Sequence, residues 1–188
     1  MKACLASKNP NKLRELRDAL PGWELELLEA DEYPPEEGET YRDNARIKAR
    51  FGRGIAPPDE WVLGEDSGIE VDALDGGPGP ESARWAKGRE AEKLLEALGD
   101  AENRRAHYVC ELVAIAPDRR EVEARGELDG TIARERRGSA GFGFDPVFVP
   151  QGHERTFGEM TPAQKARLSH RGRALEALSR RLDADKKV

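Results

Sequence analysis

The sequence lacks most of the features that would place a protein in a membrane or on nucleic acid. It contains no apolar run of about 18 or more residues, the length that spans a bilayer. Hydrophobic residues make up 37% of its 188 residues, and its net charge of −6 argues against a chain that coats nucleic acid. Its N-terminal residues are interrupted by polar groups too soon for a signal peptide. We therefore expect a cytoplasmic protein that binds neither membranes nor nucleic acid.

Cysteine and histidine are scarce, and several common catalytic patterns are missing. The two cysteines, Cys4 and Cys110, lie in apolar strand-like stretches, which predicts buried, reduced thiols. The three histidines show no zinc-like spacing. The sequence has neither a Gly-x-Ser-x-Gly nucleophile elbow nor a Walker A loop. These absences exclude the usual zinc sites, the elbow-type serine hydrolases and the P-loop nucleotide-binding proteins.

The remaining sequence alternates between strand-like and helix-like segments, which predicts one domain over residues 1–188. We expect strands over 2–6, 23–28, 61–63, 106–116, 120–127 and 144–149, with 131–135 continuing the sheet. We expect helices over 10–20, 40–53, 89–98 and 162–182. The first should end at Pro21-Gly22, Thr40 should cap the second, and the last should be interrupted near 169–172. This order indicates an α/β protein with a central mixed β-sheet flanked by helices.

The turn between the first strand and the first helix is a candidate anion site. Its residues are Ser7, Lys8, Asn9, Pro10, Asn11 and Lys12. A strand-to-helix turn directs free backbone N–H groups at an anion, and the two lysines add positive charge. The alternative is an ordinary helix N-cap with solvated lysines.

Carboxylates follow the predicted strand 61–63, in the segment Glu65-Asp66-Ser67-Gly68. The carboxyl end of a strand is where α/β sheets place their active sites. Carboxylates with open water positions hold Mg²⁺ beside a polyphosphate, and Glu36 or Glu37 of a separate acidic loop would add another. A polar turn and a solvated loop are the alternatives.

Two further clusters offer groups that suit a nucleotide base. Residues 138–146 combine glycines with Phe142 and Phe144 as a stacking face and Asp145 as an acceptor; the alternative is a glycine-rich turn with core phenylalanines. Lys165 and the segment 169–172 group hydrogen-bond donors near a helix break; the alternative is a solvated basic helix.

Taken in order, these pieces are far more specific than any one of them. The series resembles the inosine triphosphate pyrophosphatase family over residues 2–182. It consists of Ser7-x-Asn9-x-x-Lys12, Thr40-Tyr41-x-Asp43-Asn44-Ala45-x-x-Lys48-Ala49, Asp66-Ser67-Gly68-Ile69, Gly141-Phe142-Gly143-Phe144-Asp145-Pro146 and Ser169-His170-Arg171-Gly172. The resemblance implies an elongated α/β fold, two lobes with a cleft between them, and a homodimer. It also implies Mg²⁺-dependent hydrolysis of deaminated purine nucleoside triphosphates to the monophosphate and pyrophosphate.

The resemblance also implies the roles of individual residues. Asp66 is expected to be catalytic and, with Glu36, to bind the metal; the spacing to Lys48 favours Glu36 over Glu37. The residues expected to bind substrate are Ser7, Lys8, Asn9, Pro10, Asn11, Lys12, Lys48, Ser67, Phe142, Gly143, Phe144, Asp145, Lys165, His170 and Arg171. Two alternatives remain: a pyrophosphatase for other modified nucleotides, and a nucleotide-binding protein without catalysis.

Overall fold

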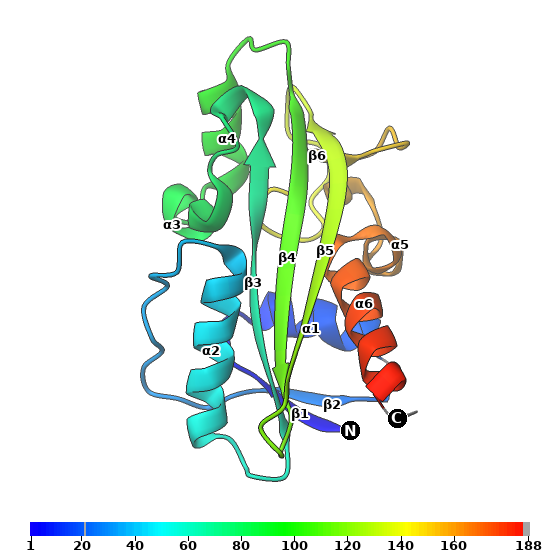
Figure 1. Ribbon diagram of the computed structural model, residues 1–188. Helices are drawn as coiled ribbons and strands as arrows, with labels where there is room; N and C mark the ends of the chain where they lie inside the picture. The colour runs from blue at the N-terminus through cyan, green and yellow to red at the C-terminus, as the bar shows by residue number, and fades with distance from the viewer. Residues whose placement is uncertain (21, 186–188) are drawn as a thin grey trace. The chain divides into compact units, whose positions relative to one another are not determined.

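The computed structural model describes residues 1–20 and 22–185 (Figure 1). The strands are β1 (Lys2–Leu5), β2 (Glu24–Leu27), β3 (Trp61–Val71), β4 (Arg105–Ile115), β5 (Glu121–Ile132) and β6 (Phe148–Pro150). The α-helices are α1 (Pro10–Ala19), α2 (Tyr41–Ile55), α3 (Ser82–Ala86), α4 (Glu90–Leu98), α5 (Pro162–Leu168) and α6 (His170–Asp185). None of the helices in this described part combines the length and the apolar character needed to cross a membrane.

The strands form one mixed sheet in the order β2-β1-β3-β4-β5-β6, which confirms the predicted fold class. β1 pairs in parallel with β2 and with β3, whereas β5 and β6 are antiparallel. Parallel neighbours need crossover connections, and α1 and α2 supply them. β4 and β5 are joined by a short turn in which the amide of Arg119 donates to the carbonyl of Ala116.

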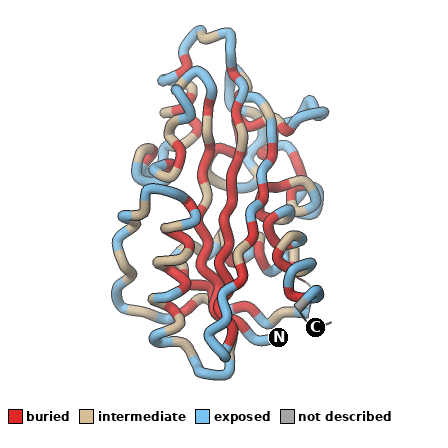
Figure 2. Tube along the Cα trace, viewed as in Figure 1, coloured by how far each residue is buried: buried red, intermediate tan, exposed pale blue. Residues whose placement is uncertain are grey.

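The chain divides into two compact units, and the first contains Met1–Asp66, Cys110–Gly126 and the segment that begins at Arg171. Alternate side chains of β4 point to opposite faces of the sheet in this unit. Cys110, Leu112 and Ala114 pack against α1 and α6, and Val113 and Ile115 pack against α2. Both faces of the sheet are therefore covered at β4, and Figure 2 shows the two central strands, β3 and β4, as mostly buried.

The second unit contains Ser67–Val109 and Glu127–His170. One face of its sheet, which includes Ile69, Tyr108 and Phe148, packs against apolar residues of α3 and α4. Alternate positions on the same strands, such as His107 and Asp129, are half-buried or exposed. The sheet of this unit thus has one apolar, covered face and one polar face.

Several local predictions are confirmed. Thr40 caps α2 by accepting a hydrogen bond from the amide of Asp43, α4 ends at Gly99, and a break separates α5 from α6. The two cysteines are buried and form no disulfide. Pro21, part of the predicted stop of the first helix, lies outside the described residues. The single domain, the elongated form and the cleft between two lobes stay predictions.

Two strand predictions were wrong. β3 does not end at Leu63 but continues to Val71, so Glu65 and Asp66 lie inside the strand rather than in a turn after it. A buried strand tolerates these carboxylates because the cations Lys12 and Lys48 pair with them. The strand expected over 144–149 begins only at Phe148, because Asp145 accepts a hydrogen bond from the amide of Phe142 and holds this segment in a turn.

Candidate functional site

The turn before α1 is organised by Asn9, which is the N-cap of the helix. Its side-chain oxygen accepts hydrogen bonds from the amides of Asn11 (2.9 Å) and Lys12 (3.4 Å), and Pro10 occupies the first helical turn. The expectation that these amides are free to face an anion was therefore wrong, because Asn9 already satisfies them. The positive charge of this turn resides in the side chains of Lys8 and Lys12.

The carboxylate of Glu65 is completely buried and lies between two cations. Nζ of Lys12 lies 2.6 Å from its Oε2, and Nε of Arg171 lies 3.1 Å from its Oε1. Arg171 also contacts Glu15 of α1, with 2.9 Å between Nη1 and Oε2. The charges of Lys12 and Arg171 outweigh the effect of burial and hold the pKa of Glu65 well below its usual range. Glu65 therefore stays ionised and fixes the position of both cations.

A second group of charges surrounds Lys48, which projects from the middle of α2. Its ammonium lies 2.8 Å from Oδ1 of Asp66 and forms a close ion pair with Glu36. It also donates to the carbonyl of Glu65 at 3.2 Å. Glu37, one residue further along the same loop, is exposed. The structure thus brings Glu36 and Asp66 to one cation.

Burial and charge act in opposite directions on this second group. Burial by itself lowers the pKa of Lys48, but the charges of Asp66 and Glu36 outweigh it and raise that pKa above its ordinary value. Burial raises the pKa of Asp66, and Lys48 only partly offsets this effect. Asp66 therefore binds a proton more readily than an exposed aspartate does.

The oxygen atoms around Lys48 suit Mg²⁺, which prefers carboxylate ligands and keeps several positions for water and phosphate. No group of three or more metal-binding side chains gathers within residues 1–20 and 22–185. Four carboxylates (Glu15, Glu36, Glu65 and Asp66) face three cations (Lys12, Lys48 and Arg171) in these ion pairs. A polyphosphate would add further negative charge, so a divalent cation held by Glu36 and Asp66 fits this donor set.

The second unit places three of the predicted base-binding residues in contact. Oδ2 of the buried Asp145 accepts from the amide of Phe142 at 2.7 Å and from Nζ of Lys165 at 2.5 Å. Lys165 lies over the Phe142 ring, 4.9 Å from its centroid. Asp145 therefore positions the ammonium of Lys165 beside a half-exposed aromatic ring.

The other predicted residues of this unit are buried more deeply. Phe144 is only 5% exposed and belongs to the hydrophobic core, so Phe142 alone of the pair offers a ring surface. His170 is buried and stacks on Tyr108, with 4.4 Å between the ring centroids. Ser67 and Gly143 are half-buried.

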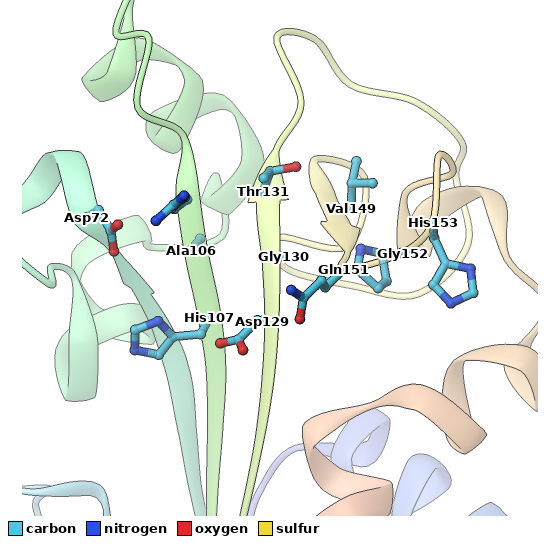
Figure 3. A pocket seen from close by; sticks show the side chains of 12 residues that line it. Asp72, Ala106, His107, Asp129, Gly130, Thr131, Val149, Gln151, Gly152 and His153 are labelled. Carbon is cyan, nitrogen blue, oxygen red and sulfur yellow. The ribbon is translucent and has the colours of Figure 1, made fainter.

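A separate cavity of about 610 Å³ lies on the polar face of the second unit's sheet. Figure 3 shows Asp72, His107, Asp129 and His153 among the side chains around it. Its polar side chains are exposed or half-buried. None of the predicted site residues lines it within the described part of the chain.

Sequence reasoning missed three residues of the first unit's site. Glu65 was noted only as a carboxylate in a motif, and its two cationic partners come from segments distant in sequence. Glu15 and Asn44 were given no role. The proximity of Asn44 to Lys48 on one helix offered a signal, since residues four apart share a helix face.

Comparison with known proteins identifies the family of the chain. A family model described as the Ham1 family matches residues 3–181. A dITP/XTP pyrophosphatase of Rhodopseudomonas palustris is 41% identical over 199 residues, covering 95% of this chain and 94% of the relative. A dITP/XTP pyrophosphatase of Deinococcus radiodurans is 44% identical over 183 residues, covering 93% and 89%.

Solved structures agree with this result. The Ham1 protein of Staphylococcus aureus is 32% identical, with a TM-score of 0.84 and coverage of 98% of this chain and all of that one. A HAM1 protein of Coxiella burnetii is 34% identical, with a TM-score of 0.81 and coverage of 98% and 99%. The similarity in sequence and in fold extends over nearly the whole chain.

Proposed function

The chain belongs to the Ham1 family and is a nucleoside triphosphate pyrophosphatase, and we propose that its substrates are the deaminated purine nucleotides ITP, dITP and XTP. The products are the nucleoside monophosphate and pyrophosphate. The observation that carries this proposal is a sequence identity of 41% and 44%, over nearly the full length of the chain, to two proteins named dITP/XTP pyrophosphatase. Removal of these nucleotides from the cellular pool, a cytoplasmic location and a homodimer are parts of the same proposal.

The triphosphate is bound by basic residues of the first unit. Lys12 and Lys48 supply positive charge, and Lys8, Ser7, Asn9 and Asn11 lie in or beside the turn before α1. Lys12 and Lys48 are both paired with carboxylates, so phosphate oxygens must share these ammonium groups with Glu65, Glu36 and Asp66. A phosphate that binds both lysines is thereby oriented from two sides.

Glu36 and Asp66 would hold Mg²⁺, which, when bound, neutralises phosphate oxygens and helps to orient a water molecule. Asp66 accepts a proton from the water whose oxygen attacks the α-phosphorus, and the bond to the bridging oxygen of pyrophosphate breaks. Lys12 and Lys48 stabilise the negative charge that develops on the leaving pyrophosphate.

The base is recognised through donors and an aromatic surface. Phe142 stacks against the purine, and Lys165 donates to its edge; Asp145, Gly143, Phe144, Ser67, His170 and Arg171 complete the predicted set. Lysine and arginine carry only hydrogen-bond donors. Hypoxanthine and xanthine present an accepting oxygen at C6, whereas adenine presents an amino group that would face another donor. ATP should therefore be a poor substrate.

One assay tests the substrate class. Pyrophosphate release is measured from ITP, dITP, XTP, GTP and ATP, with modified pyrimidine triphosphates as a further set, in the presence and absence of Mg²⁺. We expect ITP, dITP and XTP to be hydrolysed with a much larger kcat/KM than ATP, and only with the metal. If modified pyrimidine triphosphates were hydrolysed faster than ITP, dITP and XTP, the enzyme would belong to the alternative class of pyrophosphatases for other modified nucleotides. Nucleotide binding without any release would identify a non-catalytic protein.

A further inference from the structure

Asn44 connects the two carboxylates that the proposed function assigns to the metal. We propose that Asn44 is a positioning residue for the reaction, which sets the places of Asp66 and of the loop that carries Glu36; this inference rests on the proposed function. Asn44 lies in the first turn of α2 and is completely buried. Its side chain reaches β3 on one side and the loop before α2 on the other.

Both ends of the Asn44 amide are occupied, and the partners determine its orientation. Nδ2 donates to Oδ2 of Asp66 at 3.2 Å, and Oδ1 accepts from the backbone amide of Gly38 at 2.8 Å. A carboxylate only accepts and a backbone N–H only donates. The reverse orientation of the amide would therefore lose both bonds, and Asn44 acts as a link of fixed direction.

On the strand side, Asn44 completes the environment of Asp66. Oδ1 of Asp66 accepts a hydrogen bond from Lys48 and Oδ2 accepts one from Asn44, so each carboxylate oxygen has its own donor. Two donors on separate oxygens prevent rotation of the carboxylate about its last bond. A carboxylate held in this way presents its remaining lone pairs in a constant direction to a metal or a water molecule.

On the loop side, the contact is so close that only glycine fits. A Cβ atom at Gly38 would lie 2.7 Å from Oδ1 of Asn44 and 2.8 Å from its backbone nitrogen. Gly38 follows Glu36 by two residues, so this contact holds the loop near the carboxylate that pairs with Lys48. The two arms of Asn44 thus maintain the spacing between Glu36 and Asp66.

Two substitutions separate the two arms. Asn44→Asp keeps the size and the acceptor for Gly38 but replaces the donor to Asp66 with a second carboxylate. Gly38→Ala acts on the loop arm, because the added Cβ would meet Oδ1 and the backbone nitrogen of Asn44, and it leaves the Nδ2 donor to Asp66 chemically unchanged. Asn103→Asp, in an exposed turn of the second unit, and Gly54→Ala, where a Cβ meets nothing within 4 Å, serve as matched controls.

The measurements are kcat and KM for ITP, thermal unfolding, and hydrogen–deuterium exchange of residues 31–39 in metal-free protein. We expect Asn44→Asp to lower kcat about 10- to 100-fold, with a much smaller change in KM and with slow exchange preserved in the loop. We expect Gly38→Ala to speed loop exchange and also to lower kcat. The controls should match the wild type in kcat and in exchange.

Wild-type kcat in Asn44→Asp would overturn the proposal. So would a loss of kcat only in proportion to unfolded protein, because that pattern marks a purely structural role. Unchanged hydrogen–deuterium exchange of residues 31–39 in Gly38→Ala would show that the contact between Gly38 and Asn44 does not hold the loop, and it would overturn the proposal. Failure of the proposed function is a different result: the wild type itself would release no pyrophosphate from any deaminated purine nucleotide, and the positioning role would fall with it.

Discussion

The ammonium of Lys48 lies 2.8 Å from Oδ1 of Asp66, and both side chains are buried. Burial disfavours the charge of Asp66, and the nearby cations Lys48 and Lys12 offset only part of that desolvation. The close pair places a cation that can bind phosphate directly beside the group proposed to accept a proton. Changes at Asp66 are therefore the most direct test of the site.

Replacing Asp66 with asparagine should lower kcat by about 10²- to 10⁴-fold, because the amide keeps the size of the side chain but cannot accept the proton. Binding of ITP, measured by calorimetry, should change much less, since Lys12 and Lys48 remain. Asp129→Asn, an exposed position outside the site, is the control. Turnover close to that of the wild type at saturating Mg²⁺ would remove Asp66 from the reaction.

Phe142 and Phe144 should respond differently to truncation. Phe142→Ala should lower kcat/KM for ITP about tenfold or more, the size expected when a base loses a stacking partner worth about 1–3 kcal/mol. Phe144→Ala should instead cost about 3–5 kcal/mol of folding stability, because that ring is packed in the core. Steady-state kinetics and urea unfolding separate the two effects. If both variants lose only stability, Phe142 is also a core residue and not a base platform.

Gly64 lies in β3 directly against α2. A Cβ atom there would lie 2.0 Å from the carbonyl oxygen of Ala45 and 2.6 Å from the amide nitrogen of Ala49, both backbone atoms that cannot move aside. Gly64→Ala should therefore destabilise the fold by about 1–3 kcal/mol or more. Gly54 lies in α2, and a Cβ atom there would meet nothing within 4 Å. Gly54→Ala should therefore stabilise the fold by about 0.5–1 kcal/mol. Opposite signs in urea unfolding are the expected result; equal effects would contradict this packing.

Cys4 should be almost inert towards alkylation in the native protein. Burial, and then its hydrogen bond to Glu60, raise the pKa of Cys4 to about 12 from an ordinary value of 9.0. Three pKa units mean about a thousandfold less thiolate at pH 8. Iodoacetamide labelling followed by mass spectrometry should show slow reaction in the native protein, fast reaction in urea, and faster native reaction in Glu60→Gln. Native labelling at the rate seen in urea would contradict the shift.

The same shift has a consequence for stability. The unfolded thiol loses its proton near pH 9, whereas the folded thiol keeps it until about pH 12. The contribution of Cys4 to stability is therefore complete below pH 9 and is lost as the pH rises through this window. A Cys4→Ala variant should lose less stability than the wild type between these pH values.

The sequence predicts the positions of most elements because their signals are local. Thr40 and the apolar spacing of α2 are contained within one segment, and the same holds for α4 and its stop at Gly99. The strand predicted over 61–63 is too short, because a run of Gly, Glu, Asp and Ser is typical of a turn. What keeps that run in a strand is burial beside Lys12 and Lys48, which local patterns do not encode.

The sequence predicts several members of the candidate site, such as Glu36, Lys48 and Asp66, but it does not predict most of the pairings between residues. Glu65 and Arg171 are separated by 106 positions, and no spacing rule connects them. Arg171 was expected at the edge of the base, yet two of its contacts are the carboxylates of Glu65 and Glu15. Asn9 is predicted to donate to an anion, and the structure adds a second role, since its side-chain oxygen caps α1. Pairings of this kind depend on tertiary packing.

The pairing of Lys12 and Lys48 with carboxylates has a kinetic consequence, because it reduces the attraction that these lysines exert on a distant anion. The whole chain carries a net charge of −6, so the long-range field around it repels a free triphosphate during diffusion. Added salt shortens the range of that repulsion, since the screening length is about 8 Å at physiological ionic strength. Association of substrate should therefore become faster as ionic strength rises, opposite to the behaviour of enzymes that attract their substrates by charge. Recognition of the nucleotide then depends on contacts made after arrival, at distances of a few ångströms.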